Sequence, residues 1–433
     1  MNCLVTRPSG PLRGSLTVPG DKSITHRAII LGALAEGDSI VSNYCRGADC
    51  LHTIEAVQTL GVPIEIEEGH LRIAGKGLWG LREPQKILDC GNSGTGIRLL
   101  AGVLAGQSFF SVLDGDDAVR RRPMGRVVTP LRQMGATIAG RHGGNLAPLA
   151  ITGTKLHGIA YQSPIASAQV KSSILLAGLL AQGTTTMSEP SLSRDHTERM
   201  LTYLGIPLLR AGLTVTLMGQ PSYKARDIVV AGDLSAAAFF LVAASIVRDS
   251  DITVTNVGIN PTRLGVLECL QEMGGRLELL NHREQAGEPV ADLRIRSAQL
   301  HGIRISAERI PKTIDELPIL CVAAACADGE TIISGAAELR VKESDRIATM
   351  ATELRRLGAE VEERPDGLRI LGGRPLRGAV CQSYGDHRVA MAVAVAGLIA
   401  NGETRVEDTG CVATSFPDFD KHLSALLTPL RQG

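Results

Sequence analysis

The sequence has 433 residues, of which 44% are hydrophobic, 21% charged and 3% aromatic. This length predicts about two to three domains. The 45 Lys and Arg residues equal the 45 Asp and Glu residues, so the formal net charge is zero. A neutral chain is not typical of a general nucleic-acid-binding protein, and so few aromatic residues exclude a platform on which single-stranded bases stack.

The lengths of the apolar segments and the pattern of cysteines indicate the cellular compartment of the protein. The longest apolar runs, at 236–247 and 389–400, are shorter than the about 20 residues of a membrane-spanning helix. The first residues contain no apolar signal segment. The nine cysteines are scattered without a CxxC pair, which indicates buried thiols in a reducing compartment and no zinc site. We therefore expect a cytoplasmic protein without a membrane or nucleic-acid partner.

Taken in chain order, the predicted elements repeat about every seventy residues. The first copy is predicted to contain a strand at 16–18, a helix at 23–35, a strand at 39–41, a helix at 49–60 and strands at 63–67 and 70–75. Ser23 or Thr25 is the expected N-cap of its first helix. The step from an apolar helix through glycine to a β-branched strand returns at Gly37, Gly106, Gly183, Gly329 and Gly402. We therefore expect an α/β protein of six β-α-β-α-β-β copies, in two domains of three.

A polar motif begins the first helix of each copy. The motifs are GDKS at 20–23, GNSGT at 91–95, SAQVK at 167–171, GDLS at 232–235, IDELP at 314–318 and DHR at 386–388. Helix N-termini favour anions, and basic residues such as Lys22 and Arg388 are unfavourable there unless an anion is present. Each motif taken singly is also explained as an ordinary cap, but together they predict a binding site for anions.

Basic clusters support this prediction. They are RRRPMGR at 120–126, SRDHTER at 193–199 and LRVKESDR at 339–346. Arginine binds phosphate or carboxylate oxygens through two parallel hydrogen bonds. The glycine-rich segment GNSGTG matches neither the dinucleotide fingerprint nor the P-loop, so neither NAD nor ATP is expected.

The motifs PGDKSITHRA, GNSGTGIRLL, RRPMGR, SAQVKSS, ELRVKESDR and YGDHRVAM, in this order, resemble the 5-enolpyruvylshikimate-3-phosphate synthase family over nearly the whole chain. The resemblance implies the enolpyruvyl transferase fold, with two domains that each arrange three β-α-β-α-β-β units around a pseudo-threefold axis. It implies that residues 20–228 form one domain, with most of the shikimate 3-phosphate site. Residues 1–19 plus 229–433 would form the other, with the active site in the cleft between them.

The resemblance also implies a reaction. The family transfers the enolpyruvyl group of phosphoenolpyruvate to the 5-hydroxyl of shikimate 3-phosphate and releases phosphate, by addition and elimination. This is a step of the shikimate pathway to chorismate and the aromatic amino acids. The resemblance implies a monomer without metal or organic cofactor, inhibition by glyphosate, and domain closure on substrate binding.

Residue roles follow from the family's motifs. The resemblance implies that shikimate 3-phosphate is bound by Lys22, Ser23, Arg27, Ser167, Ala168, Gln169, Arg194, Asp315 and Lys342. It implies that phosphoenolpyruvate is bound by Lys22, Asn92, Gly94, Thr95, Arg122, Gln169, Lys171, Arg346 and Arg388. The implied catalytic residues are Asp315 as the base for the 5-hydroxyl proton, Glu343 as the acid for the methylene carbon, and Lys22 and His387.

Some positions depart from the family pattern. Much of the family has Ser where this chain has Ala168, and often Lys where it has Thr414. The segments GDKS, SAQVK, RDHTE and NPTR resemble the glyphosate-tolerant subclass, which commonly has Ala at the position of Gly94. We therefore expect moderate tolerance, set by other residues of the pocket.

Two alternatives remain at this point. The sister enolpyruvyl transferases that act on UDP-N-acetylglucosamine typically have a Cys in the loop aligned with 113–122, and this loop has none. A non-catalytic scaffold of repeated α/β units would need basic residues along one broad surface. Here they lie at equivalent helix starts with carboxylates between them.

Overall fold

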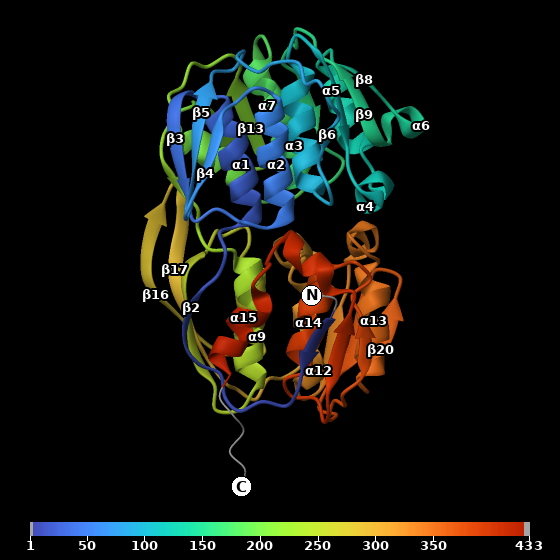
Figure 1. Cartoon of the computed structure of the whole chain (residues 1–433). Coiled ribbons are helices and arrows are strands. Elements are labelled where there is room, and N and C mark those ends of the chain that lie inside the picture. Colours follow the sequence, from blue (N-terminus) through green and yellow to red (C-terminus); the bar gives the residue numbers. More distant parts are fainter. Residues whose placement is uncertain (1–2, 428–433) are drawn as a thin grey trace. The chain divides into compact units, whose positions relative to one another are not determined.

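The computed structural model describes residues 3–427 and divides the chain into two compact units (Figure 1). The 20–231 unit contains Gly20–Ala231 and the short segment Glu284–Glu288. The 232–433 unit contains Met1–Pro19, Gly232–Arg283 and Pro289–Gly433. The sequence placed the boundary after residue 228, whereas the structure has it after Ala231, and the exchange of Glu284–Glu288 was not anticipated.

The 20–231 unit consists of three repeats. The first contains α1 (Lys22–Ala33), β3 (Glu36–Ser42), α2 (Ala48–Thr59), β4 (Ile64–Glu67) and β5 (His70–Lys76). The second contains β6 (Leu88–Asp89), α3 (Gly94–Ala105), β7 (Phe110–Asp114), α4 (Asp117–Arg121), α5 (Gly125–Gln133), β8 (Thr137–Gly140), α6 (Arg141–Gly144) and β9 (Leu146–Thr152). The third contains β10 (Ala160–Gln162), α7 (Ala168–Leu180), β11 (Thr184–Ser188), α8 (His196–Tyr203), β12 (Leu208–Ala211) and β13 (Thr214–Met218), and β14 (Ile228–Val229) follows it.

The 232–433 unit has the same plan. It begins with β1 (Cys3–Thr6) and β2 (Arg13–Thr17), and continues with α9 (Leu234–Ile246), β15 (Asp251–Gly258), α10 (Gly265–Glu272), β16 (Arg276–Gln285) and β17 (Glu288–Arg296). Its next repeat contains β18 (Arg304–Ile305), α11 (Ile310–Thr313), α12 (Leu317–Cys326), β19 (Glu330–Ile333), the 3-10 helix η1 (Ala337–Val341), α13 (Arg346–Arg356), β20 (Glu360–Arg364) and β21 (Gly367–Leu371). The last contains β22 (Val380–Gln382), α14 (His387–Ala396), β23 (Thr404–Glu407), η2 (Thr409–Thr414) and α15 (Phe419–Leu426).

Each repeat forms its own sheet, with one exchange of strands. In the second repeat the order is β6-β7-β9-β8, where β6 and β7 are parallel and the remaining pairs are antiparallel. Strand β2 was expected in the first repeat, but it pairs in parallel with β15, and β14 takes the equivalent place beside β3. The chain passes from one unit to the other after Pro19 and after Ala231. Because β2 and β14 lie just before these two points, β2 belongs to the 232–433 unit and β14 to the 20–231 unit.

The central helices are buried on all sides. In α9 every residue from Leu234 to Ser245 is buried, and α14 is buried from His387 to Ala396. A helix that is apolar all round is covered all round, which explains the two apolar runs of the sequence without a membrane. None of the helices in the described part of the chain is long and apolar enough to cross a bilayer.

Candidate functional site

The polar motifs of the 20–231 unit cap the first helices of its repeats. A carboxylate oxygen of Asp21 accepts a hydrogen bond from the amide of Ile24 at 2.9 Å, at the start of α1. The expected caps Ser23 and Thr25 are wrong, because α1 already begins at Lys22. Thr25 instead donates its hydroxyl to the carbonyl oxygen of Asp21 at 2.8 Å. An N-cap accepts from amides one turn inside the helix, so only Asp21 is correctly placed.

Ser93 and Ser167 cap the other two helices in the same way. The Ser93 hydroxyl accepts from the amide of Gly96 at 2.9 Å in α3, and Ser167 accepts from Val170 at 3.5 Å in α7. The hydroxyl of Ser167 is therefore engaged in a cap at the position where the sequence predicted a ligand contact.

Lys22 has a carboxylate partner within the protein. Its ammonium lies 2.8 Å from the side chain of Asp49, at the start of α2, and the side chain of Lys22 is 15% exposed. A basic residue at this helix N-terminus therefore does not by itself require a bound anion. The sequence offered Asp49 only as a residue of the predicted second helix.

Arg27 is held from three sides. Its guanidinium donates to the carbonyl oxygen of Ser23 at 2.7 Å, to the hydroxyl of Thr197 at 2.7 Å and to that of Ser172 at 2.6 Å. Burial lowers the pKa of Arg27 to about 10, while Glu198 acts in the opposite direction and Arg194 adds to the lowering. Arg27 therefore carries its charge at neutral pH, and Arg194 lies within its electrostatic reach.

Gln169, at the start of α7, is oriented by α3. Its side-chain oxygen accepts from Arg98 at 2.5 Å, and its nitrogen donates to the hydroxyl of Thr95 at 2.9 Å. Arg98 also donates to the carbonyl oxygen of Pro123 at 3.0 Å. The sequence prediction missed Arg98, although an arginine within the apolar stretch GTGIRLL was a signal that could have found it.

The glycine-rich motif contacts the arginine-rich loop. A Cβ added to Gly94 would lie 2.3 Å from a terminal nitrogen of Arg122, so the guanidinium packs directly against the backbone of Gly94. Asn92 instead donates its side-chain amide to Asp116 at 2.7 Å, at the start of α4. The structure thus brings Gly94, Thr95 and Arg122 together and turns the amide of Asn92 to a protein partner.

Lys171 does not join this cluster. Its side chain is 1% exposed, and its ammonium lies 2.8 Å from Glu189 and 2.8 Å from Glu198. The prediction that Lys171 contacts phosphoenolpyruvate therefore has no support, because two buried carboxylates already surround the charge. Ala168 is bound through its backbone: its carbonyl oxygen accepts a hydrogen bond from the hydroxyl of Ser172 at 2.6 Å.

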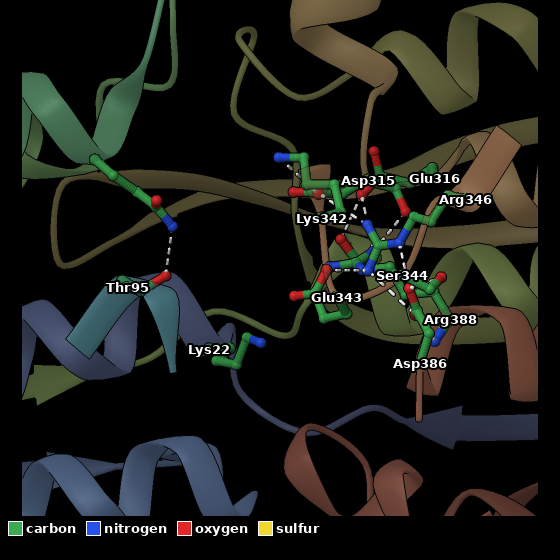
Figure 2. A network of polar contacts seen from close by, with 12 residues as sticks. Lys22, Thr95, Asp315, Glu316, Lys342, Glu343, Ser344, Arg346, Asp386 and Arg388 are labelled. Atoms are coloured by element: carbon green, nitrogen blue, oxygen red, sulfur yellow. Dashed lines mark hydrogen bonds and ion pairs between the residues drawn. The ribbon is translucent and has the colours of Figure 1, made fainter. Parts of the chain in front are cut away.

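The polar cluster of the 232–433 unit is centred on Arg346, at the start of α13 (Figure 2). Its guanidinium donates to both carboxylate oxygens of Asp386, at 2.8 and 3.2 Å, and to Glu343 at 2.7 Å. A third carboxylate, Asp315, lies 3.6 Å from its remaining nitrogen. Burial alone would raise the pKa of Asp386, but the charge of Arg346 outweighs it, and the pKa is lowered.

Two further cations surround Asp315. Arg388, in the first turn of α14, donates to the carbonyl oxygen of Asp315 at 2.7 Å. The ammonium of Lys342 lies 4.0 Å from the carboxylate of the same residue, and burial lowers its pKa. Asp315 therefore lies close to three basic side chains.

Residues outside the predicted set complete this cluster. Asp386 caps α14 through the amide of Arg388 at 2.9 Å and also binds the hydroxyl of Ser344 at 3.1 Å. The motif DHR contained Asp386, but the sequence did not show that it pairs with Arg346. A ring nitrogen of His387 lies 3.3 Å from the hydroxyl of Thr414.

The two clusters differ in chemical capacity. The cluster of the 20–231 unit offers guanidinium and ammonium groups with amide and hydroxyl donors, which suit phosphate and carboxylate oxygens. The cluster of the 232–433 unit combines carboxylates with Arg346, Lys342 and His387, which suits proton transfer beside an anion. Within residues 3–427, no group of His, Cys, Asp and Glu side chains is arranged to hold a metal ion.

Known proteins resemble this chain over nearly its whole length. Residues 6–423 match the model of the EPSP synthase family, described as 3-phosphoshikimate 1-carboxyvinyltransferase. The chain is 52% identical to the 3-phosphoshikimate 1-carboxyvinyltransferase of Geotalea uraniireducens, over 99% of this chain and 100% of that one. It is 54% identical to that of Citrifermentans bemidjiense, over 97% and 98% of the two chains.

A solved structure supports the same assignment. The EPSP synthase of Acinetobacter baumannii is 44% identical and superimposes with a TM-score of 0.88, covering 98% of both chains. The full-length sequence match and the shared two-unit architecture show that the chain belongs to the EPSP synthase family, the 3-phosphoshikimate 1-carboxyvinyltransferases.

Proposed function

We propose that the protein transfers the enolpyruvyl group of phosphoenolpyruvate to the 5-hydroxyl of shikimate 3-phosphate, with release of phosphate. The observation that carries the proposal is the cluster in which Asp315 and Glu343 flank the guanidinium of Arg346. Addition of a hydroxyl across the double bond of an enol phosphate needs one proton removed from oxygen and one delivered to carbon, hence a base and an acid in different surroundings. The family match supplies the reaction for which this pair is suited.

In this proposal the 20–231 unit binds the anions. Lys22, Ser23 and Arg27 hold shikimate 3-phosphate, with Ser167, Gln169 and Arg194. Gly94, Thr95 and Arg122 bind phosphoenolpyruvate, because the guanidinium of Arg122 lies against the backbone of the glycine-rich turn. The two substrates together carry several negative charges, which fixed cations must offset.

The 232–433 unit supplies the proton transfers. Asp315 takes the 5-hydroxyl proton. The ammonium of Lys342 lies 4.0 Å from its carboxylate, and Arg388 donates to its carbonyl oxygen. Glu343 protonates the methylene carbon of phosphoenolpyruvate, while Arg346 binds the substrate anion next to it. His387 and Lys22 assist these transfers. In this proposal both clusters act on the same pair of substrates.

The same pocket would bind glyphosate, an anion that competes with phosphoenolpyruvate. Because Gly94 leaves Arg122 undisturbed, we propose only moderate tolerance of this inhibitor. Nothing in the proposed mechanism requires a second copy of the chain, so we propose a monomer.

Phosphate release from the two substrates tests the proposal directly. The full chain, incubated with shikimate 3-phosphate and phosphoenolpyruvate, should release phosphate at a rate that glyphosate lowers in competition with phosphoenolpyruvate. UDP-N-acetylglucosamine in place of shikimate 3-phosphate should give no release. Release with the sugar nucleotide, or with neither acceptor, would overturn the proposal.

A further inference from the structure

The motif RDHTE supplied only Arg194 to the proposed site, yet its threonine is completely buried. Thr197 lies in the first turn of α8 and is 0% exposed. Its hydroxyl accepts from the Nε of Arg27 at 2.7 Å and donates to the hydroxyl of Ser172 at 2.7 Å. Thr197 therefore connects a substrate-binding arginine of α1 to a serine of α7.

The directions of these hydrogen bonds are fully determined. Ser172 donates its single hydroxyl proton to the carbonyl oxygen of Ala168 at 2.6 Å, so it must accept from both Arg27 and Thr197. Thr197 in turn has only one proton, which goes to Ser172, and so it must accept from Arg27. A hydroxyl has one donor and two acceptor positions, and both side chains use them without conflict.

The network fixes one edge of the guanidinium of Arg27 and leaves another for a ligand. Thr197, Ser172 and the carbonyl oxygen of Ser23 each accept one N–H of Arg27. A guanidinium has one N–H on Nε and two on each terminal nitrogen. Among the residues that the structure describes, each terminal nitrogen therefore uses one N–H for the protein and retains one for a carboxylate or phosphate oxygen.

A buried charge network holds α8 in place. Lys171, from α7, lies between Glu198 of α8 and Glu189 after β11, at 2.8 Å from each. Glu189 also accepts from the amide of Ser193 at 2.9 Å. The positive charge of Lys171 thus faces two buried carboxylates, and the helix that carries Thr197 is anchored to the helix that carries Ser172.

We propose that Thr197 is a positioning residue for Arg27, and that its hydroxyl, held by Ser172, sets the plane of the guanidinium that receives the anionic sugar-acid substrate. The inference rests on the proposed function and deepens it. A guanidinium oriented before the substrate arrives loses less conformational freedom on binding. Loss of the hydroxyl also leaves a buried charged donor without its acceptor.

The test uses the full chain with Thr197→Val, which keeps the size of the side chain and removes the hydroxyl. Its dissociation constant for shikimate 3-phosphate, measured by titration calorimetry, should rise roughly tenfold, and its KM for this substrate should rise equally. Its kcat and its KM for phosphoenolpyruvate should stay within about twofold of wild type. Thr197→Ser retains the hydroxyl and should restore binding.

A matched control lies on the same helix. Thr202 is exposed and donates only to the backbone carbonyl of Glu198 at 2.9 Å, so Thr202→Val should leave the affinity for shikimate 3-phosphate unchanged. If Thr197→Val does not fold, Ser172→Ala tests the same network, because Ser172 accepts from both Arg27 and Thr197. It should show the same rise in KM for this substrate alone.

A double-mutant cycle separates positioning from a general structural role. In the background of Arg27→Ala, the further change Thr197→Val should not weaken binding again, since its effect passes through Arg27. Unchanged affinity in Thr197→Val, or an undiminished effect in the Arg27→Ala background, would overturn the inference alone. A wild-type chain that neither binds shikimate 3-phosphate nor releases phosphate would overturn the proposed function as well.

Discussion

Two arginines of the 20–231 unit and the central arginine of the 232–433 unit differ in their hydrogen-bond partners. Arg27 and Arg98 donate to hydroxyl, amide and carbonyl oxygens, all of them neutral. Arg346 instead donates to the carboxylates of Asp386 and Glu343 and lies near that of Asp315. Neutral acceptors orient a guanidinium without adding a negative charge beside it, whereas carboxylate partners also balance its charge. The charge of Arg346 in turn lowers the pKa of Asp386.

The comparison teaches that similar helix starts serve different purposes. In the 20–231 unit α1 carries an arginine that neutral hydrogen-bond partners orient, which suits the binding of an anion. In the 232–433 unit they provide carboxylates next to cations, which suits proton transfer. Substitutions in the first unit should therefore change substrate affinity, and those in the second should change turnover.

The largest effect on turnover is expected from substitutions of the carboxylates in the 232–433 unit. Asp315→Asn and Glu343→Gln keep the side-chain shape and should each lower kcat roughly a thousandfold, because each removes one proton-transfer group. The matched change in the other unit, Ser23→Ala, should raise KM for shikimate 3-phosphate with kcat within about twofold. Steady-state phosphate release measures both. If both carboxylate variants keep wild-type turnover, the division between binding and proton transfer is wrong.

A smaller effect is expected where Arg122 packs against the glycine-rich turn. Gly94→Ala places a methyl group against the guanidinium of Arg122, which must move. We expect KM for phosphoenolpyruvate and the inhibition constant of glyphosate to rise on the order of tenfold. KM for shikimate 3-phosphate serves as the internal control and should not change. Unaltered inhibition by glyphosate would show that Arg122 moves without loss of ligand contact.

The smallest effect concerns a buried histidine of the 20–231 unit. His26 in α1 lies 2.7 Å from the hydroxyl of Thr53 and 3.2 Å from that of Ser93, and burial, together with the charge of Lys22, lowers its pKa to about 3. Between its ordinary value of 6.5 and about 3, the unfolded chain binds a proton that the folded chain does not. The stabilising contribution of His26 is therefore complete above pH 6.5 and is lost as the pH falls.

Urea unfolding at several pH values checks this expectation. Each bound proton changes the free energy of unfolding by about 1.4 kcal/mol per pH unit, and His26→Gln should remove up to this slope between pH 6 and 4.5. Because turnover depends on the other unit, the variant should keep the pH dependence of kcat. Identical unfolding slopes in wild type and variant would show that His26 takes up its proton in the folded chain.

Much of the fold followed from local patterns. The helix at 23–35, the glycine stops and the strands at 63–67 and 70–75 correspond to α1, β4 and β5. The exchange of β2 and β14 between sheets could not be predicted, because the two strands belong to equivalent positions of the repeat. Which sheet each one completes depends on where the chain passes from one unit to the other.

The candidate site could also be predicted only in part from the sequence. The motifs located Gln169, Arg346 and Arg388, and the structure places each of them in a polar cluster. The prediction for Lys171 failed to anticipate Glu189 and Glu198. In sequence, a basic residue beside SAQ has the same appearance whether it faces a ligand or two buried carboxylates.

The sequence by itself determined the repeat, the capped helix starts and the types of side chain that they carry, because helix register and capping depend on neighbouring residues. Only the tertiary structure decided which cation has which partner. Thr197 meets Arg27 and Asp386 meets Arg346 across long stretches of chain. Such pairs form where burial removes water and leaves each charged group to be satisfied by whichever polar atom the packing brings near. A net charge of zero thus describes the whole chain, while the chemistry depends on how these pairs are distributed.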